Sequence, residues 1–325
     1  MMVTGMQEIF DKMREGLDAG EDMVLAVILE ASGSTPRGKG AAMLSGRRGL
    51  LAGSIGGGAL EGAALRRVRQ CLEEKRSEKL QFLLDSGALR TPEEIATGMI
   101  CGGEVSLWLQ YIDASREGSH RLAKDALSVM KDGGKAFLRF DLQTQEISVA
   151  MREVSEGPDV FFIPFGPAER AVLFGAGHVA QALAPILKSV DFRVVVMDDR
   201  PEFADPSLFP EAAQVICGDF RHLSTFFTFC ESDYAVVVTS GHQHDFEVEE
   251  QILQQELAYI GVIGSRKKTA AVNAKLRAAG ITEAQLAKVH TPIGLSIGAV
   301  TPAEIAVSIA AEMIQVRAER RKAEE

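Results

Sequence analysis

Cysteine is scarce in this sequence, and the cysteines that are present stand far apart. The four are Cys71, Cys101, Cys217 and Cys230, and no two of them form a C-x-x-C pair. This spacing fits neither a disulfide framework nor a zinc ribbon. Because disulfides belong to oxidising compartments, we expect a reduced, cytoplasmic protein.

Long hydrophobic runs are also missing. The longest apolar run near the start, Met23 to Leu29, is far shorter than the ~20 residues that a membrane-spanning helix needs. The N-terminus carries Glu8, Asp11 and Glu15 without an apolar segment, so it does not have the pattern of a secretory signal. We therefore expect a soluble protein with no membrane partner.

Positive charge is in the minority. Lys and Arg number 35 against 45 Asp and Glu, which gives a formal net charge of −10. This balance argues against sequence-independent nucleic-acid binding, which needs a cationic surface. The hydrophobic share of 46% and the charged share of 25% are typical of globular proteins.

The length of 325 residues predicts about two domains. Glycine, proline and acidic residues interrupt the periodic pattern between Arg152 and Arg170. We therefore expect one domain at residues 1–155 and a second at 165–325, with a short strand at 160–163 between them.

The C-terminal half alternates short apolar runs with helical patterns. Apolar runs bounded by glycine or charge are typical of parallel strands, and this alternation is typical of a doubly wound α/β domain. We expect a Rossmann-like parallel sheet. The predicted strands are 171–174, 194–197, 235–238 and 260–263, and the predicted helices are 179–188, 248–256, 267–279 and one that starts at Thr301.

The N-terminal half mixes helices and strands less regularly, which predicts an α+β domain with antiparallel or mixed pairing. The fold class is therefore α/β, with an α+β domain before the Rossmann-like one. The predicted helices are 6–19, 60–75 and 120–131, and the predicted strands are 23–30, 41–44, 80–84, 104–112 and 136–140.

A G-x-G-x-x-A fingerprint at Gly175, Gly177 and Ala180 follows a predicted strand and opens a predicted helix. The first glycine permits the tight turn, and the second lets a phosphate approach the backbone at the positive helix end. Asp198 ends the next strand, where a ribose-binding acid is expected. The pattern predicts a Rossmann fold, with NAD(P) or another nucleotide as a candidate ligand.

A second glycine cluster, Gly56-Gly57-Gly58 after Ser54, also lies between a predicted strand and a predicted helix. Consecutive glycines before a helix expose backbone N–H donors to an anion. The cluster lacks the G-K-[ST] ending of a P-loop, which disfavours triphosphate hydrolysis. Upstream, Ser34 and Arg37 supply a hydroxyl and a cation. Together these residues predict a pocket for a phosphorylated ligand, although two tight turns with solvated cations would give the same pattern.

Cys101, followed by Gly102 and Gly103, stands at the entrance to a predicted strand. Two glycines leave the thiol little cover, unlike Cys71 inside a predicted helix. Cys101 is therefore a candidate thiolate that ligates a soft metal or carries sulfur. Most single cysteines are small core residues, so that alternative stays open.

Histidines gather after the predicted strands of the C-terminal half. In an open α/β sheet these positions share the carboxyl edge, where ligands bind. Such histidines also commonly bond to backbone carbonyl groups. The edge would further hold Asp245 and a second anion loop with Ser265 and Arg266. The four histidines are His178, His242, His244 and His290.

These motifs, taken in order, resemble the XdhC/CoxI family of xanthine dehydrogenase accessory proteins. The resemblance runs from about Val24 to the helix after Thr301. The motifs that carry it are Gly33-Ser34-Thr35-Pro36-Arg37, Gly53-Ser54-Ile55-Gly56-Gly57-Gly58, Cys101-Gly102-Gly103, Gly175-Ala176-Gly177-His178, His242-Gln243-His244-Asp245, Ile263-Gly264-Ser265-Arg266 and His290-Thr291-Pro292-Ile293-Gly294-Leu295.

The resemblance implies a maturation factor that binds the molybdenum cofactor, a molybdopterin, and promotes insertion of its sulfurated form into an apo molybdenum hydroxylase. It also implies a cysteine desulfurase as partner, and a homodimer is a candidate state. No catalytic residue is expected, and Cys101 is the candidate metal ligand. The cofactor-binding candidates are Ser34, Arg37, Ser54, Gly56, Gly57, Gly58, Cys101, Gly102, Gly103, Gly175, Gly177, His178, Asp198, His242, His244, Asp245, Ser265, Arg266 and His290.

Two other functions stay open on the residues alone. One is an NAD(P)-dependent oxidoreductase built on Gly175, Gly177 and Asp198. The other is a metal-dependent hydrolase that would use His242, His244 and Asp245 as ligands, although their spacing in a turn is a weak signal.

Overall fold

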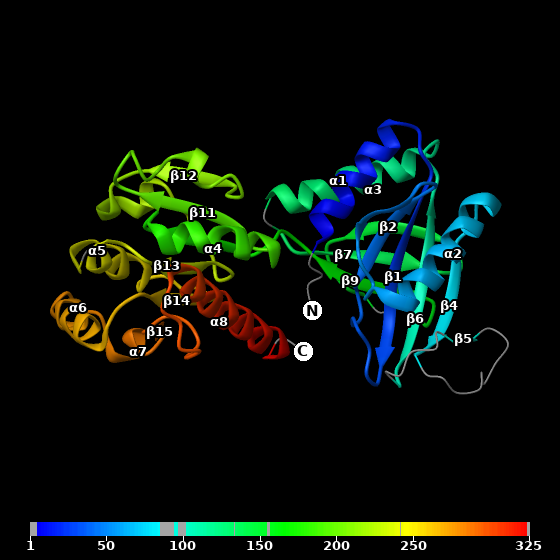
Figure 1. The fold of residues 1–325 in the computed structure, drawn as a ribbon. Helices are drawn as coiled ribbons and strands as arrows, with labels where there is room; N and C mark the ends of the chain where they lie inside the picture. The colour runs from blue at the N-terminus through cyan, green and yellow to red at the C-terminus, as the bar shows by residue number, and fades with distance from the viewer. Residues whose placement is uncertain are drawn as a thin grey trace. The chain divides into compact units, whose positions relative to one another are not determined.

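The chain forms two compact units that divide after Ala168 (Figure 1). The computed structural model describes residues 5–84, 94–96, 102–132, 134–154, 157–240 and 242–323, without the side chains of residues 94–96, 132, 242, 243 and 266. Within these residues no helix is long and apolar enough to cross a membrane.

The first unit is an α+β domain with two sheets. Its large sheet has the strand order β3-β2-β1-β6-β4-β5, in which only the β4–β5 pair is parallel, and its small sheet has the antiparallel order β8-β7-β9. The elements are α1 (Met6–Asp18), β1 (Met23–Ser32), β2 (Ala42–Gly46), β3 (Gly49–Gly53), α2 (Gly58–Glu74), β4 (Glu78–Leu83), β5 (Glu94–Ala96), β6 (Glu104–Ile112), α3 (Glu117–Asp132), β7 (Ala136–Asp141), β8 (Glu146–Ala150) and β9 (Val160–Phe165).

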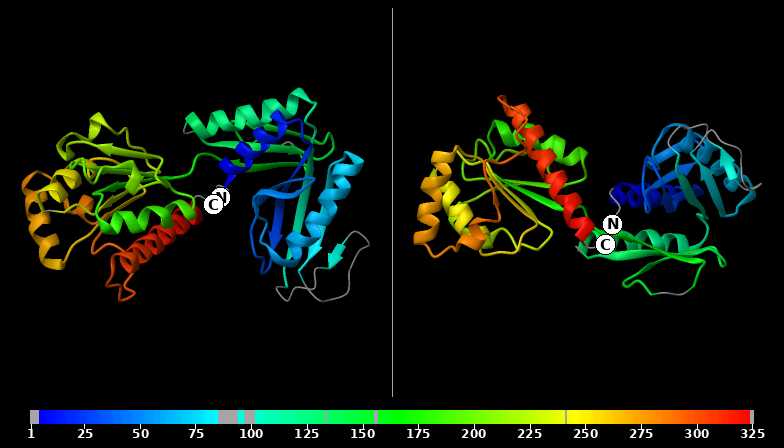
Figure 2. Two further views of the ribbon diagram at one scale, coloured as in Figure 1. Left: turned by 45° about the horizontal axis from the view of Figure 1, so that its top comes forward. Right: turned by 90° about the horizontal axis from the view of Figure 1, so that it is seen from below.

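Strand β1 is buried on both faces, which explains its unbroken apolar run. Leu25 and Val27 point to the core that contains α1 and α3, whereas Val24 and Ala26 point to the core beneath α2. Side chains of a strand alternate between the faces of a sheet, so two helical layers require apolar residues at every position. Helices α1 and α3 lie side by side in Figures 1 and 2.

The second unit is a doubly wound parallel sheet, as the alternating pattern predicts. Its strand order is β12-β11-β10-β13-β14-β15, and every pair is parallel. The elements are β10 (Arg170–Phe174), α4 (His178–Ser189), β11 (Arg193–Asp198), η1 (Pro206–Leu208), β12 (Gln214–Cys217), η2 (Phe220–Thr225), β13 (Tyr234–Val237), α5 (His242–Ile252), β14 (Tyr259–Val262), α6 (Arg266–Ala278), α7 (Glu283–Leu286), β15 (Val289–His290) and α8 (Pro302–Ala323).

Helices cover both faces of this sheet. Leu173 and Val236 pack with α4 and α8 on one face, and Val172 and Val237 pack with α5 and α6 on the other. Figure 2 shows α4 and α8 side by side. The sheet order reverses between β10 and β13, and this is the point where open α/β sheets bind ligands at their carboxyl edge.

Three predictions about elements were wrong in their details. Helix α5 begins at His242, six residues before the predicted start at Val248. The strand at 160–163 does not lie between the domains, because β9 pairs with β7 inside the first unit. The short strands β5, β8 and β12 were not predicted, and β3 and β15 were implied only by the motifs expected to follow them, without bounds.

Candidate functional site

Two of the motifs of the first unit meet through backbone contacts that only glycine allows. A Cβ atom on Gly103 would lie 2.5 Å from the carbonyl oxygen of Ser34, and one on Gly33 would lie 3.0 Å from the carbonyl oxygen of Gly102. The first distance is shorter than real Cβ atoms show, and the second is tight at a residue whose φ of +68° already favours glycine. The loop after β1 is therefore held against the segment that enters β6.

The third motif joins the same group. A Cβ atom on Gly56 would lie 2.7 Å from Cβ of Pro36 and 3.6 Å from Cγ of Arg37. The glycine loop between β3 and α2 therefore packs against the loop that carries Arg37. Above Gly57 and Gly58 there is open space, with no atom of the described chain within 4 Å of either added Cβ. A ligand can thus approach the backbone at the N-terminus of α2.

The N–H groups of the glycine loop already bind a carboxylate of the protein itself, that of Glu61. Glu61 in the first turn of α2 accepts hydrogen bonds from the backbone N–H groups of Ile55 and Gly57, at 3.3 and 3.2 Å. It also accepts one from the hydroxyl of Ser54 at 2.8 Å. The donor arrangement expected for a phosphate is present, but Glu61, which the sequence reasoning missed, occupies part of it.

The remaining side chains of this group face solvent. Ser34 and Arg37 are exposed, and neither forms a side-chain hydrogen bond or ion pair within the described residues. An unpaired guanidinium beside backbone N–H groups is suited to a phosphate. Cys101 lies outside the described residues, next to Gly102. Cys71, by contrast, is buried in α2, and burial raises the pKa of its thiol to about 11.

In the second unit, the Rossmann fingerprint has the expected backbone. Gly175 has a φ of +103°, and an added Cβ would lie 2.6 Å from the carbonyl oxygen of Val238. Gly177 precedes α4, and no described atom lies within 4 Å of its added Cβ. The turn thus has the tight first glycine and the open second glycine that suit a phosphate at a helix N-terminus.

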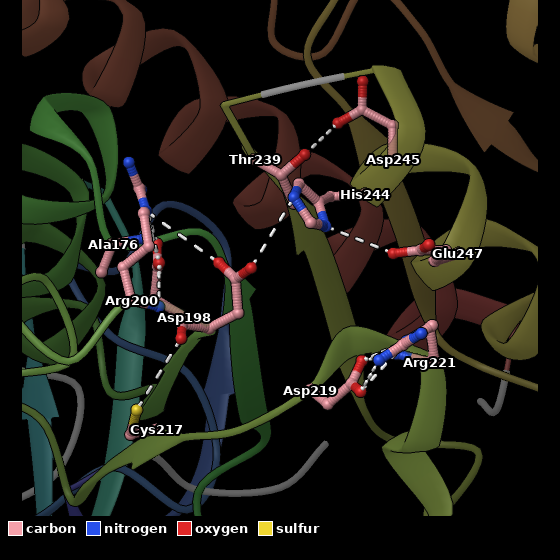
Figure 3. Close-up of polar contacts among 11 residues, drawn as sticks. Ala176, Asp198, Arg200, Cys217, Asp219, Arg221, Thr239, His244, Asp245 and Glu247 are labelled. Carbon is pink, nitrogen blue, oxygen red and sulfur yellow. Dashed lines mark hydrogen bonds and ion pairs between the residues drawn. The ribbon is translucent and has the colours of Figure 1, made fainter.

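The carboxylate of Asp198 is fully occupied by protein donors (Figure 3). The backbone N–H of Ala176 donates to it at 2.8 Å, and the backbone N–H, Nε and Nη2 of Arg200 donate at 3.0, 2.9 and 2.9 Å. Burial opposes ionisation, but these hydrogen bonds hold the pKa of Asp198 below its usual value. Contact with a ribose stays a prediction, and it would require Arg200 to move.

The side chains of His244 and Asp245 point in different directions, as Figure 3 shows. The ring of His244 lies 3.2 Å from Glu247 and 3.7 Å from Asp199. Asp245 is buried on the other side, where Thr239 donates to it and Lys268 pairs with it. The side chain of His242 is not described. The described residues contain no group of three His, Cys, Asp or Glu side chains that could hold a metal.

The other predicted site residues of this unit lie apart. His178 is exposed in the first turn of α4. His290 lies within β15, opposite Gly261, and not beyond the end of a strand as expected. Its ring contacts Tyr259 and lies 3.5 Å from Glu312 of α8. Because β15 is only two residues long, the sequence pattern did not distinguish the strand from the loop that follows.

The second anion loop is only partly described. Ser265 caps α6, and its hydroxyl accepts a hydrogen bond from the backbone N–H of Lys268 at 3.3 Å. The side chain of Arg266 lies outside the described residues. Lys268 turns inward to Asp245, so its ammonium group is not directed at an anion at the helix N-terminus.

The fold and these motifs define a class: an α/β protein whose first unit carries a glycine loop suited to anions and whose second unit is Rossmann-like. A model of the XdhC and CoxI family matches residues 17–83, and a model of the XdhC Rossmann domain matches residues 171–313. Together these matches cover well over half of the chain, which belongs to the XdhC and CoxI family. The resemblance found from the motifs is thus confirmed.

Similar proteins are consistent with this assignment. The chain is 29% identical to a probable xanthine dehydrogenase subunit of Bacillus subtilis, over 93% of this chain and 95% of that protein. It is 24% identical to the molybdenum cofactor insertion chaperone PaoD of Escherichia coli, over 93% and 86%. A crystal structure described as a xanthine dehydrogenase from Bacillus halodurans has a TM-score of 0.80 at 25% identity, and covers 97% of this chain and 98% of its own.

Proposed function

We propose that this protein binds the molybdenum cofactor and promotes insertion of its sulfurated form into a xanthine dehydrogenase-type molybdenum hydroxylase. Membership of the XdhC and CoxI family and similarity to a molybdenum cofactor insertion chaperone support this role. The observation that carries the proposal is the convergence of the Ser34–Arg37 loop, the Gly56–Gly58 loop and the Gly102–Gly103 segment in one place.

The chemistry of this place fits a molybdopterin as cargo. The ligand has a terminal phosphate, a pterin with donors and acceptors, and a metal bound by sulfur. Arg37 would contact the phosphate by charge-assisted hydrogen bonds. The backbone N–H of Gly58 would supply a further donor, and that of Gly57 would do so where the phosphate replaces Glu61. Cys101 would ligate the metal, because a thiolate is a soft ligand. Binding and release are sufficient, and no chemical turnover is required.

The partners follow from this role. An apo molybdenum hydroxylase would receive the cofactor, and a cysteine desulfurase would provide the sulfur before transfer. A homodimer is part of the proposal as well. The further candidates His178, His244 and Ser265 would then contact the cofactor or a nucleotide in the second unit.

The test is twofold. Protein purified from cells that make molybdopterin is analysed by mass spectrometry for the co-purified cofactor, and its effect on reconstitution of an apo-hydroxylase is measured. We expect bound molybdopterin and a faster gain of hydroxylase activity with sulfurated cofactor. Protein that neither binds molybdopterin nor accelerates reconstitution would overturn the proposal.

A nucleotide in the second unit is the alternative that the open space above Gly177 favours. An NAD(P)-dependent oxidoreductase would bind NADH tightly and oxidise it when substrate is added. Fluorescence titration with NADH distinguishes the two functions. The bonds between Arg200 and Asp198 predict weak binding by the unmodified protein, since the ribose-binding carboxylate is already paired.

A further inference from the structure

Helix α8, the last helix of the second unit, is apolar on two sides. One side belongs to the core, where Ala306, Ile309 and Met313 are buried. The other side faces solvent, with Val307 at 50% and Ile314 at 38% exposure. A helix on the surface of a globular protein normally turns a polar face to water. The second apolar side of α8 therefore indicates an interaction surface.

The exposed side of α8 has the spacing of a coiled-coil seam. Six residues follow one another at alternating intervals of three and four positions, which keeps them on one stripe of a helix. The stripe is apolar in the middle, acidic at one end and basic at the other. Each of its residues is exposed or half-buried. We call this set the α8 stripe, and it consists of Glu304, Val307, Ala311, Ile314, Ala318 and Arg321.

The region around the α8 stripe holds much of the exposed apolar surface of the described chain. Of the ten exposed large hydrophobic residues in the described ranges, five lie between positions 295 and 314. Three of them, Leu295, Ile297 and Val300, precede α8. The backbone N–H of Leu295 donates to the carbonyl oxygen of Ser308 at 3.2 Å, which holds this loop beside the helix. Exposed apolar surface gathered in one place marks an interaction site.

We propose that two copies of this chain pair through the α8 stripe, with their helices antiparallel about a two-fold axis. One register of the two helices matches the sizes of the facing side chains. It sets Val307 opposite the partner subunit's Ala318, and Ile314 opposite the partner subunit's Ala311. A large side chain thus meets a small one in each layer of the seam, and the two-fold axis repeats both layers.

The charged ends of the stripe favour the antiparallel arrangement. The same register places Glu304 opposite the partner subunit's Arg321, whereas parallel helices would set each of them opposite its own like-charged copy. Both groups can make this contact. Oε2 of Glu304 accepts the backbone N–H groups of Val300 and Thr301, and Oε1 has no partner within the described residues. Arg321 lies 3.7 Å from Glu169, which is too long for a hydrogen bond.

This inference specifies the surface of the homodimer that is part of the proposed function. The first experiment measures the mass of the full chain by sedimentation equilibrium from nanomolar to micromolar concentration, without cofactor. We expect a dimer. Ile314→Lys should raise its dissociation constant roughly 100-fold or more, because the change occurs twice in one interface. Gln315→Lys is the matched control. It adds the same charge at the next residue, which is exposed and outside the stripe, and should leave the dimer unchanged.

Disulfide crosslinking tests the register. In a chain that carries both Val307→Cys and Ala318→Cys, oxidation should join two copies, because each new thiol faces the other one in the partner subunit. Either change alone leaves the two identical positions about 16 Å apart along the helix axes, which is too far for a disulfide. The single variants should therefore not crosslink, and they also control for the native cysteines.

Circular dichroism establishes that each variant is folded. The inference is overturned if the unmodified chain stays monomeric throughout, or if Ile314→Lys and Gln315→Lys dimerise equally well. Crosslinking of the double variant that is no greater than that of the single variants overturns it as well. Molybdopterin binding and reconstitution are measured separately on the same protein. A monomer that retains both would remove this interface and leave the role in cofactor insertion intact.

Discussion

The backbone N–H of Gly57 donates a hydrogen bond of 3.2 Å to the carboxylate of Glu61, four residues further along the chain. The glycine loop of the first unit is therefore bound to an anion on its own helix. An incoming phosphate has two routes: it can use the donors that Glu61 leaves open, or it can replace Glu61. The first prediction distinguishes them.

Glu61→Ala removes this carboxylate. If a ligand phosphate competes with Glu61, the variant should bind molybdopterin more tightly, because the N–H groups of Ile55 and Gly57 become available. It should also be less stable by about 1–3 kcal/mol, since these donors lose their acceptor. Binding is measured by fluorescence quenching and stability by urea denaturation. Glu73→Ala, an exposed position on the same helix, is the control; a weaker affinity in Glu61→Ala alone would show that Glu61 itself helps to bind the ligand.

Arg37→Gln should weaken molybdopterin binding by about tenfold or more, because a hydrogen bond to a charged group contributes about 1.5–3 kcal/mol. Stability should change little, since the guanidinium is exposed and has no partner in the described chain. The control is Arg47→Gln, an exposed arginine beyond the opposite end of β2. Equal affinities in the two variants would remove Arg37 from the site.

Cys101→Ala should abolish accelerated reconstitution of an apo-hydroxylase, whereas Cys71→Ala should retain it. The buried thiol of Cys71 has its pKa raised to about 11 and is therefore largely protonated at neutral pH, and only a thiolate ligates a metal or attacks sulfur. Reconstituted hydroxylase activity is the readout. Equal loss or equal retention in both variants would mean that Cys101 has no special role.

The sequence revealed the second unit more fully than the first, for a physical reason. Strands of a parallel sheet covered on both faces are apolar throughout, so β11 and β13 stood out as short runs. Helix α5 was placed too late because its first turn, from His242 to Asp245, is polar and carries no helical period. Those polar residues include His244, which lies near Asp199 and Glu247, and Asp245, which is buried.

Side-chain partners from distant elements could not be predicted at all. The sequence placed Asp198 at the end of a strand, but only the fold shows that the backbone N–H of Ala176, in the turn before α4, donates to its carboxylate. Likewise, Asp245 looked like a metal ligand beside two histidines, whereas its partner is Lys268 on the next helix. Spacing along the chain predicts which residues lie next to each other on one helix or strand. Contacts between different elements depend on the sheet order, which the spacing does not give.

Gly103→Ala should disrupt the contact between the Ser34–Arg37 loop and the Gly102–Gly103 segment. The added methyl group would lie 2.5 Å from the carbonyl oxygen of Ser34, and such overpacking costs about 1–3 kcal/mol. Because the shift would separate Ser34 from Gly102, molybdopterin affinity should fall together with stability. Gly118→Ala is the control, since an added Cβ there meets no described atom within 4 Å and the residue lies in α3. It should be neutral or slightly stabilising; a similar loss of affinity in both would argue against the steric contact.

Glu249→Gln should change how stability depends on pH. Burial raises the pKa of Glu249 from 4.5 to about 8 in the folded protein, so the folded state keeps a proton that the unfolded state releases. Its contribution to stability is therefore fully present below about pH 4.5 and is lost as the pH rises through 8.

The glutamine stays neutral, so the variant should lose less stability than the unmodified protein as the pH rises from 5 to 9. Between pH 5 and 9 the free energy of unfolding of the unmodified protein should fall by a few kcal/mol more than that of the variant, on the order of the full pKa shift. Urea denaturation at intervals of pH measures this difference, with Glu250→Gln as the charge-matched control. Parallel curves for Glu249→Gln and the unmodified protein would show that the carboxyl group of Glu249 titrates in the folded protein as it does in the unfolded chain.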